Sequence, residues 1–470
     1  MKRLLPFCFL SLLLFSACQK DNSNPSGGIT DDPGIFQDQY GRQLILHGLN
    51  TGSKTPSIDS WIQESDVDRE DKEFGFNFVR YLIIWEGIEP EKDVFDESYL
   101  DRIEVRVNWY TSRGMYVMLD MHQDLYSISF GGDGAPAWAV HTNGHPINTD
   151  NPYGNLWFLK SLDPAVVAAF QNFWQYSNYK ELQDHYILAW KKVAERFKDN
   201  PYVIGYDLMN EPYAGDLGRN ISGNFERTQL KQFYDRLIPA LRSIDDQKYL
   251  IFEPTSLGNN QGLPCNLPKI NDPRSIQRLA FAPHCYPLFV EANPGPYDSE
   301  GKNELNNWKR ERAKDIKMQN CPLIIGEIGL SPDLPGFDEF LDDAFNFTDL
   351  VEGGWSYWFN SHGGWGPLND DGTESPIMQQ LVRTYPKAIQ GKINSFTFDR
   401  VSKKFMLSYS ANTAISQPTE IFVPVRYYPS GYNLSVSGTS NYKQEYDVDR
   451  QLLKLYVKEN ATVAVEITPK

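Results

Sequence analysis

Two glutamates in this chain each stand at the end of a short apolar run. Glu211 ends the segment VIGYDLMNE, with Asn210 before it and Pro212 after it, and Glu327 ends the segment CPLIIGE. Burial disfavours the charged form of a carboxyl group, so an acid at the end of a buried strand costs free energy. A buried salt bridge explains one such glutamate equally well. Two in the same setting favour a site for acid–base or nucleophilic chemistry.

Other polar side chains stand at the ends of apolar runs in the same way. They are Asn50, Arg80, His122, Asp124, Asn210, Glu253, His284, Tyr286 and Trp358. Buried charge is expensive, so a set of this kind indicates a functional site rather than packing. Paired carboxylates are typical of glycoside hydrolysis, in which one protonates the leaving oxygen and the other attacks the anomeric carbon. A separation of about 5–5.5 Å would indicate a retaining enzyme, but the sequence leaves that distance open.

Motifs for other chemistries are weak or absent. The HQD segment at residues 122–124 has no second histidine at helical spacing and no acidic loop, so we expect no metal site. The GxSxG motif of a serine nucleophile does not occur. Neither GxGxxG nor a P-loop follows an early strand, and no cofactor is expected.

Strand-like runs alternate with helical patterns along most of the chain. The runs are residues 44–50, 76–85, 115–124, 202–211, 248–254, 278–287, 321–329 and 353–360. Most are continuously apolar, as in parallel strands buried on both faces, and amphipathic helices are expected at 100–110, 186–197 and 230–241. This alternation predicts a (β/α)8 TIM barrel, with the polar residues gathered at the carboxyl ends of its strands. A doubly wound open sheet is the alternative, which the missing dinucleotide motif disfavours.

The predicted barrel, residues 34–390, carries an insertion and is followed by a second domain. Residues 125–180 separate the third strand from its helix, and loops of this length are usually functional. Short strands separated by turn residues predict an all-β sandwich at 391–470. Aromatic side chains in the insertion form either a satellite core or an apolar wall for a lipid-like group. They are Trp138, Trp157, Phe158, Phe173 and Trp174.

NEP at residues 210–212, at the fourth strand-like run, and GE at residues 326–327, at the seventh, resemble the clan of (β/α)8 retaining glycosidases, specifically glycoside hydrolase family 5. RYLIIWEGIEP, MLDMHQDLYS, GAPAWA and MNEPYAG, together with a C-terminal sandwich, resemble the endoglycoceramidase-like branch of that family. The resemblance covers nearly the whole mature chain. It implies Glu211 as the acid/base, Glu327 as the nucleophile, and a glycosphingolipid substrate cleaved between the glycan's glucose and ceramide. The family's other active-site residues fall on Arg80, His122, Asn210, His284, Tyr286 and Trp358.

Physical chemistry suggests roles for these residues. Asn210 is expected to hold the sugar 2-hydroxyl, a contact that strengthens in the transition state. Tyr286 is expected to hydrogen-bond Glu327, while the charge of Arg80 lowers the pKa of that carboxyl. His284 would orient or tune the acid/base.

Four further residues, besides Arg80, His122, Asn210, His284 and Tyr286, are assigned to binding of the substrate. Trp358 would be an apolar platform beneath the sugar ring, and Trp138 would belong to the apolar wall. In the endoglycoceramidase-like branch, the resemblance implies that Asp124 and Lys54 help to bind the first sugar. A solvated loop charge is the alternative for Lys54.

The amino-terminal residues resemble a bacterial lipoprotein signal. Residues 1–17 have a basic start and an apolar stretch of signal-peptide length, and LFSAC resembles a lipobox that makes Cys18 the acylated residue. Residues 18–33 would be a flexible tether. These features predict a lipid-anchored protein of the bacterial cell envelope. A plain secretory signal with an incidental cysteine is the alternative.

Composition narrows the partners of the protein. A formal charge of −16 argues against binding of nucleic acid, which needs clustered lysine and arginine. Three cysteines in the mature part, Cys265, Cys285 and Cys321, permit at most one disulfide. We expect a monomer. Two alternative functions stay open: an endo-β-glucanase or a β-glucosidase for another amphiphile such as a steryl glucoside, and a non-catalytic glycan-binding lipoprotein.

Overall fold

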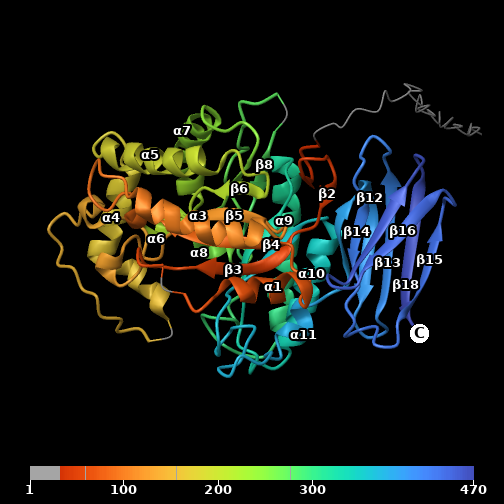
Figure 1. The fold of residues 1–470 in the computed structure, drawn as a ribbon. Helices are drawn as coiled ribbons and strands as arrows, with labels where there is room; N and C mark the ends of the chain where they lie inside the picture. Colours follow the sequence, from red (N-terminus) through yellow and green to blue (C-terminus); the bar gives the residue numbers. More distant parts are fainter. Residues whose placement is uncertain (1–31, 59, 155, 276) are drawn as a thin grey trace, which may run out of the picture.

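The computed structural model describes residues 32–470 apart from 59, 155 and 276, and it contains a sheet of eight parallel strands (Figure 1). The order of strands in this sheet is β8-β7-β6-β5-β4-β3-β10-β9. The two edge strands meet through backbone hydrogen bonds, from Phe281 N–H to the Pro322 carbonyl (3.0 Å) and from Cys285 N–H to the Glu327 carbonyl (2.9 Å). The sheet is therefore a closed barrel, which confirms the predicted fold. Its strands are β3 (His47–Gly52), β4 (Phe78–Ile84), β5 (Tyr116–His122), β6 (Val203–Asp207), β7 (Tyr249–Phe252), β8 (Leu279–Phe281), β9 (Ile324–Ile328) and β10 (Gly354–Tyr357).

Helices between the strands cover the outside of the barrel (Figure 1). Their apolar faces turn inward: in α3, Leu100, Ile103 and Val107 are buried. α5 ends shortly before Pro201, since the residue before a proline disfavours helical backbone. The helices are α1 (Glu64–Lys72), α2 (Trp85–Ile88), α3 (Glu97–Thr111), α4 (Pro164–Trp174), α5 (Lys180–Phe197), α6 (Leu217–Ile221), α7 (Lys231–Arg242), α8 (Ser256–Asn259), α9 (Ser299–Gln319), α10 (Phe337–Leu350) and α11 (Met378–Leu381).

The amino-terminal end of the barrel interior is apolar and closed. Two short strands, β1 (Phe36–Gln37) and β2 (Gln43–Leu44), pair antiparallel beneath it. The Phe36 ring lies 5.0 Å from the ring of Tyr249, whose hydroxyl donates to the Ile35 carbonyl over 3.0 Å. Further side chains complete this buried cluster: Phe78, Met118, Ile204, Ile251, Ala280, Ala282 and Ile324.

The C-terminal part of the chain forms two antiparallel sheets, as predicted, but they begin earlier than residue 391. One sheet has the order β1-β2-β11-β14-β17-β16 and the other β12-β13-β18-β15. β1, β2 and β11 therefore come from the region expected to belong to the barrel. Strands of two residues carry too little periodicity to be recognised, and β1 and β2 are defined only by their pairing with each other and by the pairing of β2 with β11. The strands are β11 (Tyr385–Ile389), β12 (Gly391–Asp399), β13 (Lys404–Ala411), β14 (Thr419–Phe422), β15 (Tyr432–Ser437), β16 (Tyr442–Asp447), β17 (Leu452–Val457) and β18 (Thr462–Pro469).

The sandwich packs on the barrel through buried side chains. His47 of β3 is stacked between Trp355, at 4.6 Å, and Tyr385, at 3.9 Å. Arg383, just before β11, pairs with Asp349 of α10 at 2.9 Å. The two parts thus share one continuous core.

The insertion after β5 folds into short 3-10 turns at Ile128–Phe130, Ala137–Ala139 and Trp157–Leu162, followed by α4. Among the described residues, no helix is long and apolar enough to cross a membrane. The predicted signal peptide, Cys18 and most of the predicted tether lie outside the described residues.

Candidate active site

Arg80 of β4 is the centre of a buried network at the carboxyl end of the barrel. Burial opposes its charge, but the surrounding carboxylates outweigh that penalty and raise its pKa well above the usual value. Arg80 is therefore a fixed positive charge, and it contacts residues that lie on or just after β3, β5, β6, β7 and β9. Its guanidinium lies close to Asn50 Oδ1 (3.0 Å), Asp120 Oδ1 (3.0 Å), Asp207 Oδ2 (2.8 Å), Asn210 Oδ1 (2.9 Å), Glu253 Oε1 (3.0 Å) and Glu327 Oε1 (3.0 Å).

Glu327 lies at the end of β9 and is held through both of its oxygens. Arg80 donates to Oε1, and the Tyr286 hydroxyl donates to Oε2 over 3.1 Å. Burial raises the pKa of Glu327, and the charge of Glu211 adds to that effect, while His284 and Arg80 oppose it. The expected influence of Arg80 is present, but burial is stronger, so the net direction is upward.

Glu211 lies in a backbone turn that a side chain rarely adopts. Its φ is +45°, a left-handed value that costs free energy in a residue other than glycine. Neighbouring side chains hold the turn: the Glu211 N–H donates to Glu253 Oε2 over 2.8 Å. Gln123 Nε2 donates to the carbonyls of Asn210 and Glu211 over 2.9 and 3.1 Å. This strained turn aims the Glu211 side chain at the centre of the site.

His284 lies between the two glutamates. Its Nδ1 is 2.8 Å from Glu211 Oε1 and 3.5 Å from Glu327 Oε2, and its Nε2 is 3.2 Å from Glu253 Oε1. Burial lowers the pKa of His284, but Glu253, Glu327 and the hydrogen bond to Glu211 raise it well above the usual value. Asn260, in the loop after β7, also donates to Glu211 Oε1 over 2.6 Å.

The two carboxylates have the spacing of a double-displacement site. One oxygen of Glu211, one nitrogen of His284 and one oxygen of Glu327 all lie within 4.8 Å of one another. Inverting glycosidases leave room for a water molecule and hold their carboxyl groups about 6.5–9.5 Å apart, whereas retaining enzymes hold them about 5–5.5 Å apart. The geometry therefore matches retention of configuration.

A second group of side chains lies beside this pair. Lys54 forms an ion pair with Asp124 and lies 4.7 Å above the centre of the Trp358 ring, so its charge is paired although its side chain is 40% exposed. The His122 ring is stacked 5.4 Å from Trp358, and its Nδ1 is 2.7 Å from Asp120 Oδ2. The carboxylates next to Lys54 raise its pKa against the effect of burial, and the same lysine lowers the pKa of Asp124. Together they offer charged hydrogen-bonding groups above an aromatic platform, an arrangement that suits binding of a sugar.

Trp138 does not join these residues. Its Nε1 donates to the Glu89 carbonyl over 3.1 Å, and its ring packs edge-on against Trp85 and His185. In this structure the ring and the N–H of Trp138 both contribute to packing of the insertion on the barrel, and its assignment to substrate binding stays a prediction.

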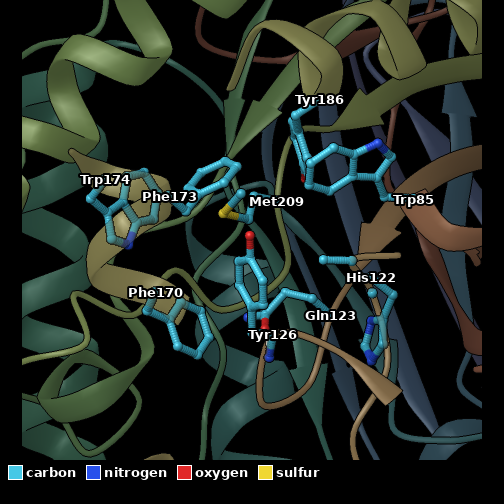
Figure 2. A pocket seen from close by; sticks show the side chains of 11 residues that line it. Trp85, His122, Gln123, Tyr126, Phe170, Phe173, Trp174, Tyr186 and Met209 are labelled. Atoms are coloured by element: carbon cyan, nitrogen blue, oxygen red, sulfur yellow. Dashed lines mark hydrogen bonds between the residues drawn. The ribbon is translucent and has the colours of Figure 1, made fainter. Parts of the chain in front are cut away.

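The aromatic side chains of α4 are likewise buried. Phe173 and Trp174 pack edge-to-face against each other and against Phe233. Figure 2 shows them around a cavity that His122, Gln123 and Met209 also line. The cavity holds only about 20 Å³, room for about one water molecule. In this conformation Phe173 and Trp174 are a satellite core rather than a wall for a lipid chain.

Asp120, Gln123, Asp207 and Asn260 belong to the site but were not assigned to it from the sequence. Asp120 and Asp207 lie inside apolar runs, and Asp120 shares a strand face with His122, two residues later, so the alternation of a strand could have revealed it. Asn260 lies in a loop and carries no sequence signal. Glu253, for which a sugar ligand and a structural pair were both open, is a structural pair in this arrangement, bonded to Arg80 and to the Glu211 backbone.

Three clusters of histidine and carboxylate side chains have the compactness of a metal site. Each touches a cation of the protein itself. Lys54 lies at the cluster around Asp124, His284 belongs to the cluster around Glu211, and Arg80 lies at the cluster around Asp207. These side chains supply the positive charge that the carboxylates need.

Comparison with known proteins places the chain in a family. The family model described as cellulase (glycosyl hydrolase family 5) matches residues 37–363. The chain belongs to glycoside hydrolase family 5. A second model, the C-terminal domain of the same family, matches residues 383–468. As a family 5 glycoside hydrolase, the chain is an enzyme, and the resemblance drawn from NEP and GE is confirmed.

Individual relatives are similar over most of their length. Endoglycoceramidase I of Rhodococcus hoagii is 32% identical over 417 residues, which cover 85% of this chain and 80% of that protein. The structure of endo-glycoceramidase II from Rhodococcus sp. with a five-membered iminocyclitol superposes with a TM-score of 0.85 at 37% identity, covering 93% of this chain and 99% of the other. A ganglioside GM3 complex of that protein also has a TM-score of 0.85, at 36% identity, covering 93% and 100% of the two chains.

Proposed function

We propose that this protein is a retaining β-glycosidase that hydrolyses the β-glucosidic bond between a glycan, or a single glucose, and ceramide in glycosphingolipids. The observation that carries the reaction type is the distance of at most 4.8 Å between oxygens of Glu211 and Glu327. Similarity to endoglycoceramidases over 85–93% of the chain supports the substrate class.

The arrangement suits a double displacement by these two glutamates. Glu211, hydrogen-bonded by Asn260 and His284, donates a proton to the glycosidic oxygen. Glu327, oriented by Arg80 and Tyr286, attacks the anomeric carbon and forms a glycosyl-enzyme. Water then attacks this intermediate while Glu211 takes up its proton, so each group returns to its starting state.

Binding of the first sugar falls to the residues beside the pair. Trp358 offers an apolar face, and Lys54 and Asp124 present a cation and an anion above it. Asn210 is fixed by Arg80 and by its own bond to the Gln123 carbonyl over 3.0 Å, in a position to contact the sugar 2-hydroxyl.

Product analysis tests the substrate class. Glucosylceramide, lactosylceramide, a steryl glucoside and a soluble β-glucan are incubated separately with the enzyme, and products are identified by mass spectrometry. Release of ceramide with the intact glycan supports the proposal. Cleavage of the glucan or the steryl glucoside alone would establish one of the alternative activities, and binding without turnover of any substrate would indicate a glycan-binding protein.

We also propose that the protein is a lipoprotein of the bacterial cell envelope, anchored through Cys18, and that it is monomeric. The lipobox-like LFSAC and the apolar stretch before it support the anchor. Mass spectrometry of the amino-terminal peptide from membranes of the producing cells tests this. A diacylglyceryl group on Cys18, absent in Cys18→Ser, is the expected result, and an unmodified amino terminus created by cleavage elsewhere contradicts it.

A further inference from the structure

Asn260 lies against the acid/base, and neither the glycosidase resemblance nor the strand pattern assigns it a task. It directly follows α8 in the loop after β7 and is 5% exposed. Its Nδ2 donates to Glu211 Oε1 over 2.6 Å, and His284 Nδ1 lies 2.8 Å from the same oxygen. Within the described part of the chain, both side-chain hydrogen bonds of the Glu211 carboxyl group are therefore made to Oε1.

Buried contacts fix the loop that contains Asn260. Arg312 of α9, which is fully buried, donates to the Asn259 carbonyl over 3.0 Å. The Thr255 hydroxyl donates over 2.7 Å to the carbonyl of Pro212, the residue directly after the acid/base. The loop is thus bonded both to a barrel helix and to the turn of the acid/base, so the amide of Asn260 keeps its place beside that carboxyl group.

The backbone of Asn260 has a separate task at the nucleophile. Its carbonyl accepts a hydrogen bond of 3.0 Å from the Tyr286 N–H, and the Tyr286 hydroxyl donates to Glu327 Oε2 over 3.1 Å. A substitution at position 260 removes the side-chain contact with Glu211 and keeps this backbone contact. The two tasks can therefore be tested separately.

Two donors at one carboxyl oxygen decide where the proton of the acid resides. A protonated oxygen is itself a donor, so a proton on Oε1 would require the hydrogen bond from Asn260 to break. Burial opposes the charge of His284, but Glu253, Glu327 and the hydrogen bond to Glu211 raise its pKa well above the usual value, and a charged histidine donates from both nitrogens. Oε2 is the oxygen left for the proton, and the Glu211 side chain is 22% exposed, so a ligand can reach it.

We propose that Asn260 is a positioning residue that, together with His284, keeps Oε1 of Glu211 as an acceptor and so presents the proton on Oε2 to the leaving oxygen. This inference rests on the proposed function, in which Glu211 is the acid/base, and deepens it. The proton passes from Oε2 to the glycosidic oxygen as Glu327 bonds to the anomeric carbon. The bond between that carbon and the glycosidic oxygen breaks, and its electron pair leaves with the oxygen, which becomes a hydroxyl group.

The hydrogen bond from Asn260 gains strength during this step. Glu211 becomes a carboxylate as it gives up the proton, and a hydrogen bond to an ionised acceptor is about twice as strong as one to a neutral acceptor. An interaction that is stronger in the transition state than in the ground state accelerates the reaction. Asn260 thus contributes to cleavage only where the leaving group needs a proton.

Three substrates with the same glycan and different leaving groups test the proposal. The kcat/KM values for lactosylceramide in detergent, phenyl β-lactoside and 2,4-dinitrophenyl β-lactoside are measured for the wild type and for Asn260→Ala. The variant should lose about 10- to 100-fold on the first two substrates, the scale of a hydrogen bond to a charged group. Its loss on the dinitrophenyl substrate should be much smaller, because that leaving group departs without a proton.

Asn260→Asp separates the donor from the shape of the side chain. Aspartate has nearly the size of asparagine, but at about pH 7 it is ionised and has no hydrogen to donate. This variant should lose at least as much as Asn260→Ala on lactosylceramide and on phenyl β-lactoside. Near-wild-type activity of Asn260→Asp on these substrates would show that Asn260 only fills space, which overturns the inference.

Asn266→Ala is the matched control, in the same loop after β7. The Asn266 side chain donates to the Pro264 carbonyl over 3.2 Å and accepts from Arg227 over 2.6 Å, and neither bond involves Glu211. Its activity on all three substrates should equal that of the wild type. The same pattern of losses as in Asn260→Ala would show that any disturbance of the loop has this effect, and would overturn the inference.

The remaining outcomes separate this inference from the proposed function. Equal losses of Asn260→Ala on all three substrates would show that Asn260 supports the fold of the site and not proton transfer, and this overturns the inference alone. If the wild type cleaves both aryl lactosides but not lactosylceramide, the proposed substrate class is wrong, and the ratio of the two aryl substrates decides the inference. A wild type that cleaves no β-lactoside overturns the proposed function and the inference with it.

Discussion

The two ends of the barrel interior differ in polarity: one is apolar and the other is charged. At the amino-terminal end, Phe36, Tyr249 and Ile251 belong to a buried apolar cluster. At the carboxyl end, the fully buried Arg80 is in contact with four carboxylates and two amides, including Glu327. The same eight strands connect the two ends.

The apolar end stabilises the fold, whereas the charged end lowers the free energy of unfolding. Burial of apolar side chains at the amino-terminal end stabilises the fold by roughly 1.5–3 kcal/mol for each large side chain. Buried charges at the carboxyl end lower the stability of the fold, because desolvation penalises every ion. Burial raises the pKa of Glu327 and of Asp207, which is the signature of that cost. Substitutions at the two ends should therefore separate activity from stability.

The largest expected effect follows from removal of the nucleophile. Glu327→Ala should lower kcat on an aryl β-lactoside by about 10⁵-fold, on the scale of other nucleophile deletions. Glu327→Gln should be equally inactive but should unfold at the same or a higher temperature, because the buried charge is gone. Thermal unfolding followed by circular dichroism measures the second effect. A clear loss of melting temperature in Glu327→Gln would show that this charge stabilises the fold.

Removal of the acid/base should affect substrates unequally. Glu211→Ala should lower kcat on lactosylceramide by about 10²–10⁴-fold, because its leaving alkoxide needs a proton. On 2,4-dinitrophenyl β-lactoside, whose leaving group departs unprotonated, the variant should still form the glycosyl-enzyme, visible as a burst of dinitrophenol. Added azide should accelerate turnover by attacking the intermediate. If Glu211→Ala and Glu327→Ala behave alike on this substrate, the assignment of the two roles is wrong.

A substitution at the amino-terminal end should lower stability and leave activity unchanged. Phe36→Ala removes a side chain only 1% exposed that packs on Tyr249, and should lower the free energy of unfolding by about 3–5 kcal/mol. Its kcat on an aryl β-lactoside at 25 °C should change less than 2-fold, since the catalytic residues lie at the other end. Urea unfolding and initial rates on the same preparation measure both quantities. The exposed Val401, at 94%, offers a control: Val401→Ala should change neither.

The sequence revealed the barrel because its strands are long, apolar and regularly spaced. It revealed Glu211 and Glu327 because an acid after an apolar run is rare enough to be noticed. β1 and β2 were not assigned to the sandwich, because their place in it depends on the pairing of β2 with β11, hundreds of positions later. Trp138 shows a similar limit: a tryptophan in a long loop looks the same in the sequence whether it contacts a ligand or Trp85.

The role of Asn260 also became visible only in the folded chain. Its side chain donates to Glu211 Oε1 over 2.6 Å, although the two residues are 49 positions apart. Local patterns thus disclosed the residues that end strands, whereas residues contributed by loops became visible only in the folded chain.

The smallest expected effect concerns His47, a titratable group at the junction of the barrel and the sandwich. His47 is buried, and neither ring nitrogen has a hydrogen-bond partner among the described residues. Burial lowers the pKa of His47 well below its usual value, and the charges of Arg383 and Lys387 add to this effect.

A histidine that stays neutral in the fold binds its proton only in the unfolded chain, at about pH 6.5. The unfolded state therefore holds more protons below that pH, and the free energy of unfolding falls by up to about 1.4 kcal/mol for each further pH unit until the folded pKa is reached. His47→Phe keeps a ring between Trp355 and Tyr385 and removes the titration. Its urea midpoint should thus fall less than that of the wild type between pH 7 and pH 5, whereas His145→Gln, at an exposed position, should follow the wild type. If the urea midpoints of His47→Phe and the wild type fall equally with pH, the acid sensitivity arises from the carboxylates at the carboxyl end of the barrel and not from this junction.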